Sequence, residues 1–551
     1  MDLLRQLKRR DNIDIILLSA RLLRTVRHLT PRQLFYRLKY GLGLVGKTRP
    51  FSVSWINCSL RIPCVQVSPC KRFLGQGRFR FINIDGELKK GWNNTEYPKL
   101  WLYQLHYHEW LFDDACDAEL WIKRWIHENP SFSGNGWEPY PLSLRIFNWI
   151  KYFVSSQKKP DQSVLDSLAL QCAHLYKHLE FQHGANHLLE NLFALKAASL
   201  IITEDKVNQR VDLLLREELE SQFLADGAHY ERSPMYHAIL MERMLDLINV
   251  LPHERESSLI ELLKQKVTVG LDWLIYMSVD SRFALFNDSG YDSAPAVNAL
   301  IEYGNNLLGW KPPEKHNEVD NTIKIKALLD SGYYRYDTQQ YSMIIDNGAI
   351  GPDENMAHAH CDMLSYCLYV NDVPAIVDSG NYDYLPGEMR DYCRSTQAHN
   401  TCSVDGGQQA ECWKTHRVGR RGYPLSTELK QEDGFAVFEG THSGFSHLMG
   451  NPVHLRHVEM KDERIFVRDQ VQSKSKHLFS SFIHLHPDCD VEVNDKAVIV
   501  IHNSFAFRIG CSVEPLIENS WYCPEFNVRI ENKVIVLSGD TPAISYAIKF
   551  I

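Results

Sequence analysis

The 551-residue sequence lacks the features that are typical of disulfide-rich, nucleic-acid-binding and transmembrane proteins. Its 13 cysteines are an odd number and form no CxxC pair, which favours reduced thiols over a disulfide framework. A formal net charge of -8 provides no basic face for nucleic acid. No apolar run near the N-terminus is long enough for a membrane span, because Arg21, Arg24 and Arg27 interrupt it. We therefore expect neither a disulfide scaffold, a nucleic-acid binder nor a transmembrane protein.

The N-terminal stretch from Met1 to Leu29 is basic and interspersed with leucines. We interpret it as a basic amphipathic helix and not as a cleavable export signal, since its apolar residues are interrupted by charge. Together with the reduced cysteines, this predicts a protein of the cytoplasm or one held peripherally at the inner membrane. A periplasmic location is the alternative.

The composition is 44% hydrophobic and 23% charged, which is typical of a packed protein. The chain is too long for one hydrophobic core, so two to four domains are expected. No internal repeat or low-complexity segment is visible.

Three regions differ in their periodicity. Residues 1–99 form a helical and irregular segment that proline and glycine interrupt. From 100 to 320 apolar residues recur at steps of three and four, as in Leu165, Leu168 and Cys172, which indicates helices packed in an α/α barrel or bundle. From 321 to 551 the period is two, which predicts an antiparallel β-sandwich after a linker near residues 311–321.

The first chemical cluster is Asn186 and His187, which precede a strongly apolar helix. The free N–H groups at the start of a helix favour an anion, so these side chains could face a binding cavity. The alternative is that Asn186 is simply the N-cap of the helix.

The second cluster runs from 226 to 237 and contains two tyrosines, two histidines, two acids and an arginine. Ser233 followed by Pro234 resembles a helix start, which would place Tyr236 and His237 in the first turn. Loops this dense in ionisable groups often line sites, although a polar helix cap would have the same composition.

The third cluster begins with AHAHCDMLSY, where a strand would place His358, His360 and Asp362 on one face. Asp378 and His399 follow within the next segments. Two histidines and a carboxylate this close suit a metal site or a proton-transfer site.

In this order, the three clusters resemble the signature segments of the heparinase II/III family. NHLLEN, DGAHYERSPMYH, AHAHCDMLSY, IVDSGNYDY and RSTQAHNT carry the resemblance, which covers most of the chain from about Trp101. It implies an N-terminal α/α toroid, or incomplete barrel, followed by an antiparallel β-sandwich, with the active site between them.

The resemblance also implies a reaction, the β-elimination of a 4-linked uronic acid. Asn186, helped by His187, would neutralise the sugar carboxylate, so that the C5 proton becomes more acidic. Tyr236 would be the acid that protonates O4, and for one C5 configuration also the base. His358 would be the base for the other configuration.

A structural zinc site is the second implication of the resemblance, with His360, Asp378 and His399 as ligands. No organic cofactor is implied. From the residues alone, His358 could instead join His360 in binding metal, which would indicate a metal-dependent hydrolase.

A polyanionic substrate needs cationic or stacking contacts. The candidate arginines are Arg232, Arg390, Arg394 and Arg417, the last within a basic run that also contains Lys414, Arg420 and Arg421. Trp137 and Tyr140 could stack on sugar rings, although a Trp in a helical domain is more often part of the core.

We therefore expect a lyase for an acidic polysaccharide, and the main alternative is a protein that binds such a polymer without cleaving it. The segments LTPRQLFYRLKYGLG and LWLYQLHYHEWLFD resemble the members of the family that accompany bacterial surface-polysaccharide genes.

Overall fold

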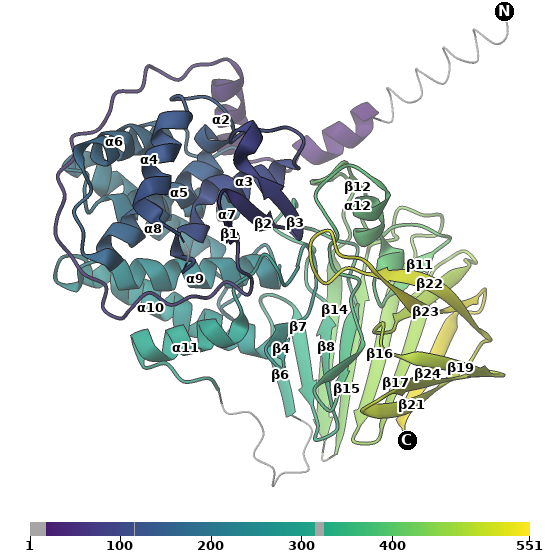
Figure 1. Cartoon of the computed structure of the whole chain (residues 1–551). Coiled ribbons are helices and arrows are strands. Elements are labelled where there is room, and N and C mark those ends of the chain that lie inside the picture. The colour runs from purple at the N-terminus through teal and green to yellow at the C-terminus, as the bar shows by residue number, and fades with distance from the viewer. Residues whose placement is uncertain (1–17, 115, 314–323, 433) are drawn as a thin grey trace, which may run out of the picture.

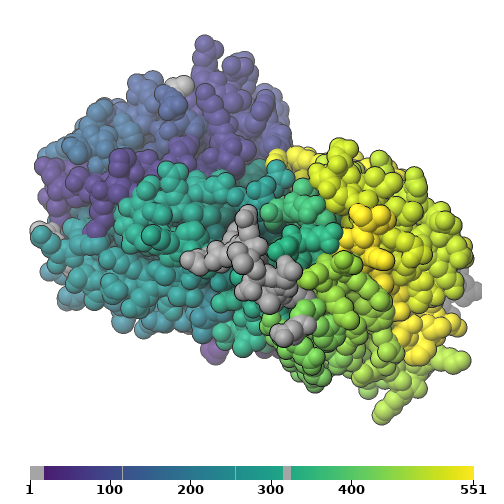
Figure 2. Space-filling view, turned by 90° about the horizontal axis from the view of Figure 1, so that it is seen from below, coloured from purple at the N-terminus to yellow at the C-terminus, as the bar shows by residue number. Residues whose placement is uncertain are grey.

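The computed structural model describes residues 18–114, 116–313, 324–432 and 434–551. Two lobes share one continuous body, a helical lobe from the first part of the chain and a β lobe from the second (Figures 1 and 2). Most of the linker predicted near 311–321, and the first half of the predicted N-terminal helix, lie outside the described residues.

The helical lobe is a toroid of antiparallel helices that pack on their sequence neighbours. Its helices are α3 (Lys99–Tyr107), α4 (Ala118–Glu128), α5 (Pro139–Ser156), α6 (Gln162–Lys177), α7 (Ala185–Ala198), α8 (Asp205–Gln222), α9 (Pro234–Val250), α10 (His253–Tyr276) and α11 (Val297–Leu308). Helix α7 contacts α5, α6, α8 and α9, which explains why it is apolar on nearly every side.

A small sheet of β1 (Phe73–Gly75), β2 (Arg78–Phe81) and β3 (Ile84–Glu87) precedes the helices. Phe73, Phe79 and Phe81 are buried in the same core as the helices that follow. The division of the chain at residue 99 therefore needs correction, because this part of the 1–99 segment belongs to the helical lobe.

The β lobe contains three antiparallel sheets of four or more strands within the described residues. One has the order β10-β9-β8-β7-β6, the second β14-β15-β16-β17-β24-β21-β20-β19 and the third β11-β18-β23-β22. The strands are β6 (Lys324–Leu328), β7 (Tyr333–Asp337), β8 (Tyr341–Asp346), β9 (Tyr366–Val370), β10 (Val373–Ile376), β11 (Cys402–Val404), β14 (Pro424–Glu432), β15 (Phe435–His442), β16 (Val453–Lys461), β17 (Arg464–Gln472), β18 (Phe479–His484), β19 (Asp490–Asn494), β20 (Ala497–His502), β21 (Phe505–Cys511), β22 (Pro515–Tyr522), β23 (Ile530–Gly539) and β24 (Ala543–Phe550).

The sandwich has one apolar core to which all three sheets contribute, for example through Leu368, Phe438 and Ile535. The hairpin of β19 and β20 pairs Val491 with Val500 and Val493 with Val498, as the period of two predicts.

A smaller apolar cluster joins the two lobes. Trp273 and Phe286 of the helical lobe pack there with Tyr333 and Ile344 of the sheet that begins the β lobe. Asp226 accepts hydrogen bonds from the backbone N–H and the hydroxyl of Ser331, at 2.7 and 2.8 Å. The contact between the lobes is thus both apolar and hydrogen-bonded, which fixes their relative orientation.

The N-terminal residues cross this junction on the outside (Figure 1). Residues 18–26 are helical, and α2 (Pro31–Gly41) begins at a capping box in which Thr30 and Gln33 bond each other's backbone N–H. Among the described residues, no helix is both long enough and apolar enough to cross a bilayer.

Candidate active site

A cavity of about 590 Å³ lies where the two lobes meet. The helical lobe contributes residues such as Tyr140, Asn186 and Tyr236, and the β lobe contributes His358 and Tyr384. A cleft of this size that is lined by side chains of several titratable types is the expected place for a reaction.

Asn186 lies in the first turn of α7 and lines the cavity. It is not the N-cap, because Gly184 occupies that position with a φ of 68°. Asn186 Nδ2 donates to Glu231 Oε2 at 2.8 Å, whereas Asn186 Oδ1 is buried with no partner among the described residues. Glu231 therefore holds one N–H of the Asn186 amide, and the amide oxygen remains able to interact with a ligand.

His187 follows Asn186 and also lines the cavity. Its Nδ1 lies 3.0 Å from Glu180 Oε1. Burial alone would lower the pKa of His187, but the Glu180 carboxylate outweighs it and raises that pKa. His187 thus favours the cationic form, which suits contact with a sugar carboxylate.

Tyr236 lies in the first turn of α9, where Ser233 is the N-cap and Pro234 the first residue, so the predicted helix start is confirmed. The hydroxyls of Tyr236 and Tyr384 are 3.0 Å apart. Burial raises the pKa of Tyr236, so its proton is retained at neutral pH. A protonated phenol in the cavity can act as an acid.

His358 and Tyr236 come from different lobes and pack ring against ring, with centroids 3.8 Å apart. The strand predicted for this segment is wrong at its start, because residues 357–365 form a loop and β9 begins at Tyr366. The backbone N–H groups of His360, Cys361 and Met363 donate to Asn287, Arg394 and Gln409, and not to a neighbouring strand. His358 reaches the cavity from this loop.

Asp288 fixes the His358 ring, with its Oδ2 at 3.0 Å from His358 Nδ1. An ionised carboxylate at Nδ1 selects the tautomer with the proton there, so Nε2 carries the free lone pair. Nε2 lies 3.4 Å from Asn186 Nδ2, which is a cavity residue. His358 is thus arranged as a base whose Nε2 meets Asn186 at the cavity, and Glu231 Oε1 lies 3.8 Å from the same nitrogen.

Asp288 was not among the residues singled out from the sequence. Asp288 also accepts a hydrogen bond from His360 Nε2 at 2.9 Å and pairs with the two terminal nitrogens, Nη1 and Nη2, of Arg390. Burial alone would raise the pKa of Asp288, but Arg390 and the two histidines hold it well below its ordinary value. In the sequence, Asp288 is marked only by its place in the short polar segment FNDSG, from Phe286 to Gly290, and such loop segments are common.

The three expected zinc ligands lie in one buried region, but their ligand atoms do not all lie within 4.8 Å of one another. His399 Nδ1 is 2.7 Å from Asp378 Oδ2, and the rings of His360 and His399 have centroids 5.4 Å apart. His360 Nδ1 and His399 Nε2 are buried with no partner among the described residues. Two unpartnered imidazole nitrogens beside a carboxylate fit zinc in type, although His360 Nε2 is bound to Asp288.

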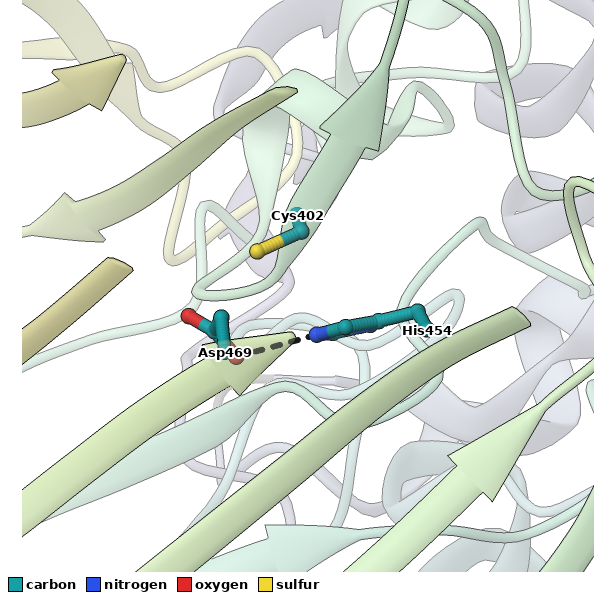
Figure 3. A group of neighbouring side chains, drawn as sticks. All are labelled: Cys402, His454 and Asp469. Atoms are coloured by element: carbon teal, nitrogen blue, oxygen red, sulfur yellow. Dashed lines mark hydrogen bonds and ion pairs between the residues drawn. The ribbon is translucent and has the colours of Figure 1, made fainter. Parts of the chain in front are cut away.

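A different trio does bring its ligand atoms within 4.8 Å of one another, namely Cys402, His454 and Asp469 (Figure 3). Asp469 already accepts from His454 Nε2 at 2.9 Å, from Ser481 and from two nitrogens of Arg456. A guanidinium on the same carboxylate repels a metal cation. We interpret this trio as a buried structural network of the sandwich.

The predicted cationic contacts to substrate are corrected by the structure. Arg390 is buried on Asp288, Arg394 donates to backbone carbonyls such as that of Ala359, and Arg232 donates to those of Ser331 and Tyr230. Arg417 is exposed beside the Trp413 ring, and none of these four arginines lines the cavity. The guanidinium groups of Arg232, Arg390 and Arg394 position the loops of the site.

The two predicted stacking residues differ in outcome. Trp137 packs against Trp125, Phe132 and His174 and does not line the cavity. Tyr140 lines the cavity, with its ring 4.5 Å from that of His187. Of the two, only Tyr140 is placed to meet a sugar ring.

Comparisons with known proteins agree with this geometry. The family model described as Heparinase II/III N-terminus matches residues 71–307, and the one described as Heparinase II/III-like, C-terminal, matches residues 321–550. A heparin-sulfate lyase of Pedobacter heparinus is 22% identical over 352 residues, which are 55% of this chain and 52% of that protein. The chain thus spans about half the length of the curated relative it matches.

Solved structures share the fold. A crystal structure of heparinase III has a TM-score of 0.69 at 17% identity and covers 95% of this chain and 92% of its own. A mutant heparan sulfate lyase from Pedobacter heparinus has a TM-score of 0.59 at 17% identity and covers 94% of this chain and 87% of its own. The expected toroid followed by a β-sandwich is thereby confirmed.

Proposed function

The chain belongs to the heparinase II/III family, and from this we propose that it is a polysaccharide lyase that cleaves a uronic-acid polymer by β-elimination. The observation that carries the proposal is the meeting of His358 and Tyr236 in one cavity, with His358 oriented by Asp288. An oriented base beside a protonated phenol supplies both proton transfers that the reaction needs.

The steps follow from the positions of these groups. His187 and the Nδ2 hydrogen of Asn186 that Glu231 does not hold donate to the sugar carboxylate, and these bonds strengthen as enolate charge develops. His358 Nε2 takes the C5 proton, and the electron pair of that bond forms the C4–C5 double bond while the C4–O4 bond breaks. Tyr236 gives its proton to O4. For the other C5 configuration Tyr236 would also be the base, which requires that its hydroxyl first gives up the proton that burial holds there.

The charges around the cavity support a substrate with few sulfates. Three Lys and Arg side chains line it among the described residues, and each is paired with a carboxylate: Arg72 with Glu109, Lys99 with Glu138 and Lys151 with Asp246. Glu109, Asp113, Glu242 and Asp383 also line the cavity. Added sulfates would meet no free cation, so we propose an unsulfated uronate polymer such as a bacterial surface polysaccharide.

Zinc remains part of the proposal as a structural ion. His360, Asp378 and His399 would hold it, supported by the two unpartnered ring nitrogens. When bound, the ion would cross-link the loop of His360 to the segments of Asp378 and His399.

Product absorbance tests the activity, because elimination creates a conjugated double bond that hydrolysis and binding do not. Wild type should raise the ultraviolet absorbance of an unsulfated glucuronate–N-acetylglucosamine polymer. Tyr236→Phe should lower kcat by ~10²–10⁴ with KM little changed, since the lost proton acts in the transition state. Tyr103→Phe is the matched control, because its hydroxyl also belongs to a cavity tyrosine but bonds Glu138.

The outcomes separate the alternatives. Activity that survives in Tyr236→Phe would remove its assigned role. Binding without any change in absorbance, across unsulfated and sulfated uronate polymers, would favour the non-cleaving alternative. Cleavage of heparin in preference to its unsulfated counterpart would contradict the substrate class while leaving the lyase activity standing.

A further inference from the structure

The N-terminal arm, defined here as residues 18–50, presents large apolar side chains to solvent. Phe35 is 60% exposed, Leu38 65% and Leu23 71%. The other exposed leucines of the arm are Leu18, Leu22, Leu34, Leu42 and Leu44. Exposed apolar side chains gathered in one segment usually mark a surface that contacts something else.

In helix α2 the apolar stripe faces away from the protein. Leu34, Leu38 and Leu42 are spaced by four residues and so share one face of the helical segment, and all three are exposed. The opposite side carries Gln33 and Tyr40, which donate to the carbonyls of Glu354 and Leu179. An ordinary surface helix would bury the leucines and expose the polar residues.

The helical residues before α2 show the same inversion. Arg21 and Arg24 lie toward the β lobe and pair with its Glu411, at 3.1 and 2.7 Å, although the Arg21 side chain is about half exposed. Leu18 and Leu22, one turn apart, are 51% and 45% exposed. Both helices are thus held to the body by polar groups, joined in α2 by the Tyr36 ring, which packs on Phe181, and their leucines are left outside.

The arm is also strongly basic. Between residues 18 and 50 the sequence contains eight Lys and Arg residues and no Asp or Glu, whereas the whole chain has a net charge of -8. In the described part of the chain, Arg27, Lys39, Lys47 and Arg49 form no ion pair. These cations flank the exposed leucines.

We propose that the arm docks on the surface of an anionic lipid bilayer. Leucine and phenylalanine side chains that enter the headgroup region, flanked by cations that attract anionic lipids, are the two contributions that such binding requires. A protein partner of matching charge would also be acidic, but exposed leucines on both helices, with no acidic residue in the arm, fit a lipid surface better.

The position of the arm gives the proposal a functional consequence. Gln33 bonds the carbonyls of His183 and Glu354, and His183 and Asn355 line the cavity. A bilayer bound to the exposed face of the arm would therefore be separated from these residues of the cavity only by helix α2.

Vesicle flotation with the full chain tests the proposal. Wild type should float with vesicles of phosphatidylglycerol and phosphatidylcholine and not with phosphatidylcholine alone, and binding should weaken as salt rises. Phe35→Gln combined with Leu38→Gln should reduce binding at least about tenfold, because the apolar contribution is lost. Leu516→Gln combined with Met449→Gln, which changes equally exposed residues of the β lobe, should bind as wild type does.

Three results would overturn the proposal. One is the absence of wild-type flotation with anionic vesicles, and the second is equal binding by the arm variant and wild type. The third is a wild-type dimer in light scattering that becomes monomeric in the arm variant without any lipid binding, since a second copy would then cover this face. Lyase activity on a soluble polymer reports folding of both variants independently.

Discussion

At Asp288, one buried carboxylate accepts hydrogen bonds from two histidines and a guanidinium. His358 faces the cavity, whereas His360 belongs to the expected zinc set. Asp288 therefore joins the proposed base, His358, to the proposed zinc ligand, His360, and Arg390 supplies the charge that keeps the carboxylate ionised.

Metal content is the prediction at this scale. The purified protein should contain about one zinc per chain, and Asp378→Ala should lose it together with some thermal stability, because a ligand shared between segments is removed. Asp391→Ala, which changes an exposed acid on the short helix α12 (Glu388–Cys393), is the control. Elemental analysis without chelators measures both, and a wild type without metal would show that the ligand assignment is wrong.

The sequence predicted the polar residues of the cavity better than their partners. Asn186, His187, Tyr236 and His358 all line it. The arginine assignments failed because a guanidinium can bind a ligand or a buried backbone carbonyl equally well, and the sequence does not distinguish the two. Asp288 was missed because its loop motif is unremarkable until the fold brings it to His358.

At the scale of elements, the turn between α8 and α9 depends on Gly227. Its φ is 95°, and a Cβ there would lie 2.3 Å from the carbonyl oxygen of Val269 on α10. The helical connection therefore approaches α10 more closely than any side chain allows.

Gly227→Ala should destabilise the protein by more than ~3 kcal/mol, because backbone strain and a clash with a carbonyl act together. Gly309→Ala is the matched control: its φ is 67° with nothing within 4 Å, so only the conformational cost of ~1–2 kcal/mol applies. Urea unfolding of both variants measures the difference. Equal losses would contradict the close approach.

Periodicity predicted the elements where one face is buried, as in α6 and in the hairpin of β19 and β20. It failed at residues 357–365, where alternating residues form a loop. Alternation of polar and apolar residues indicates a strand only where a sheet buries one face. In this loop the buried polar groups bond Asp288 and Asn287, and not a neighbouring strand.

For the whole molecule, buried neutral histidines make stability depend on pH. Burial lowers the pKa of His106 to about 3 and that of His237 to about 4. Burial also holds the pKa of His108 well below its ordinary value. The indole N–H of Trp149 donates to His108 Nδ1 at 2.9 Å, a contact that protonation of this nitrogen would abolish.

The unfolded chain binds protons at these histidines near pH 6.5, and the folded chain does not. Stability should therefore be fully present above about pH 6.5 and fall as pH is lowered to 5, by about 2 kcal/mol for each such histidine. Urea unfolding should show a drop in His108→Gln that is smaller by about that amount. His127→Gln, at an exposed position, should keep the full drop, and identical drops in wild type and His108→Gln would refute the linkage.

The division of the site between two lobes also affects when a newly made chain becomes competent. Asn186 and Tyr236 leave the ribosome with the toroid, whereas His358 follows only with the β lobe. Because domains generally fold in the order of synthesis, a nascent toroid would present the groups that recognise a sugar carboxylate before the base that attacks its neighbour exists. If the chain is the lyase proposed above, translation itself delays the onset of cleavage until the second lobe has docked.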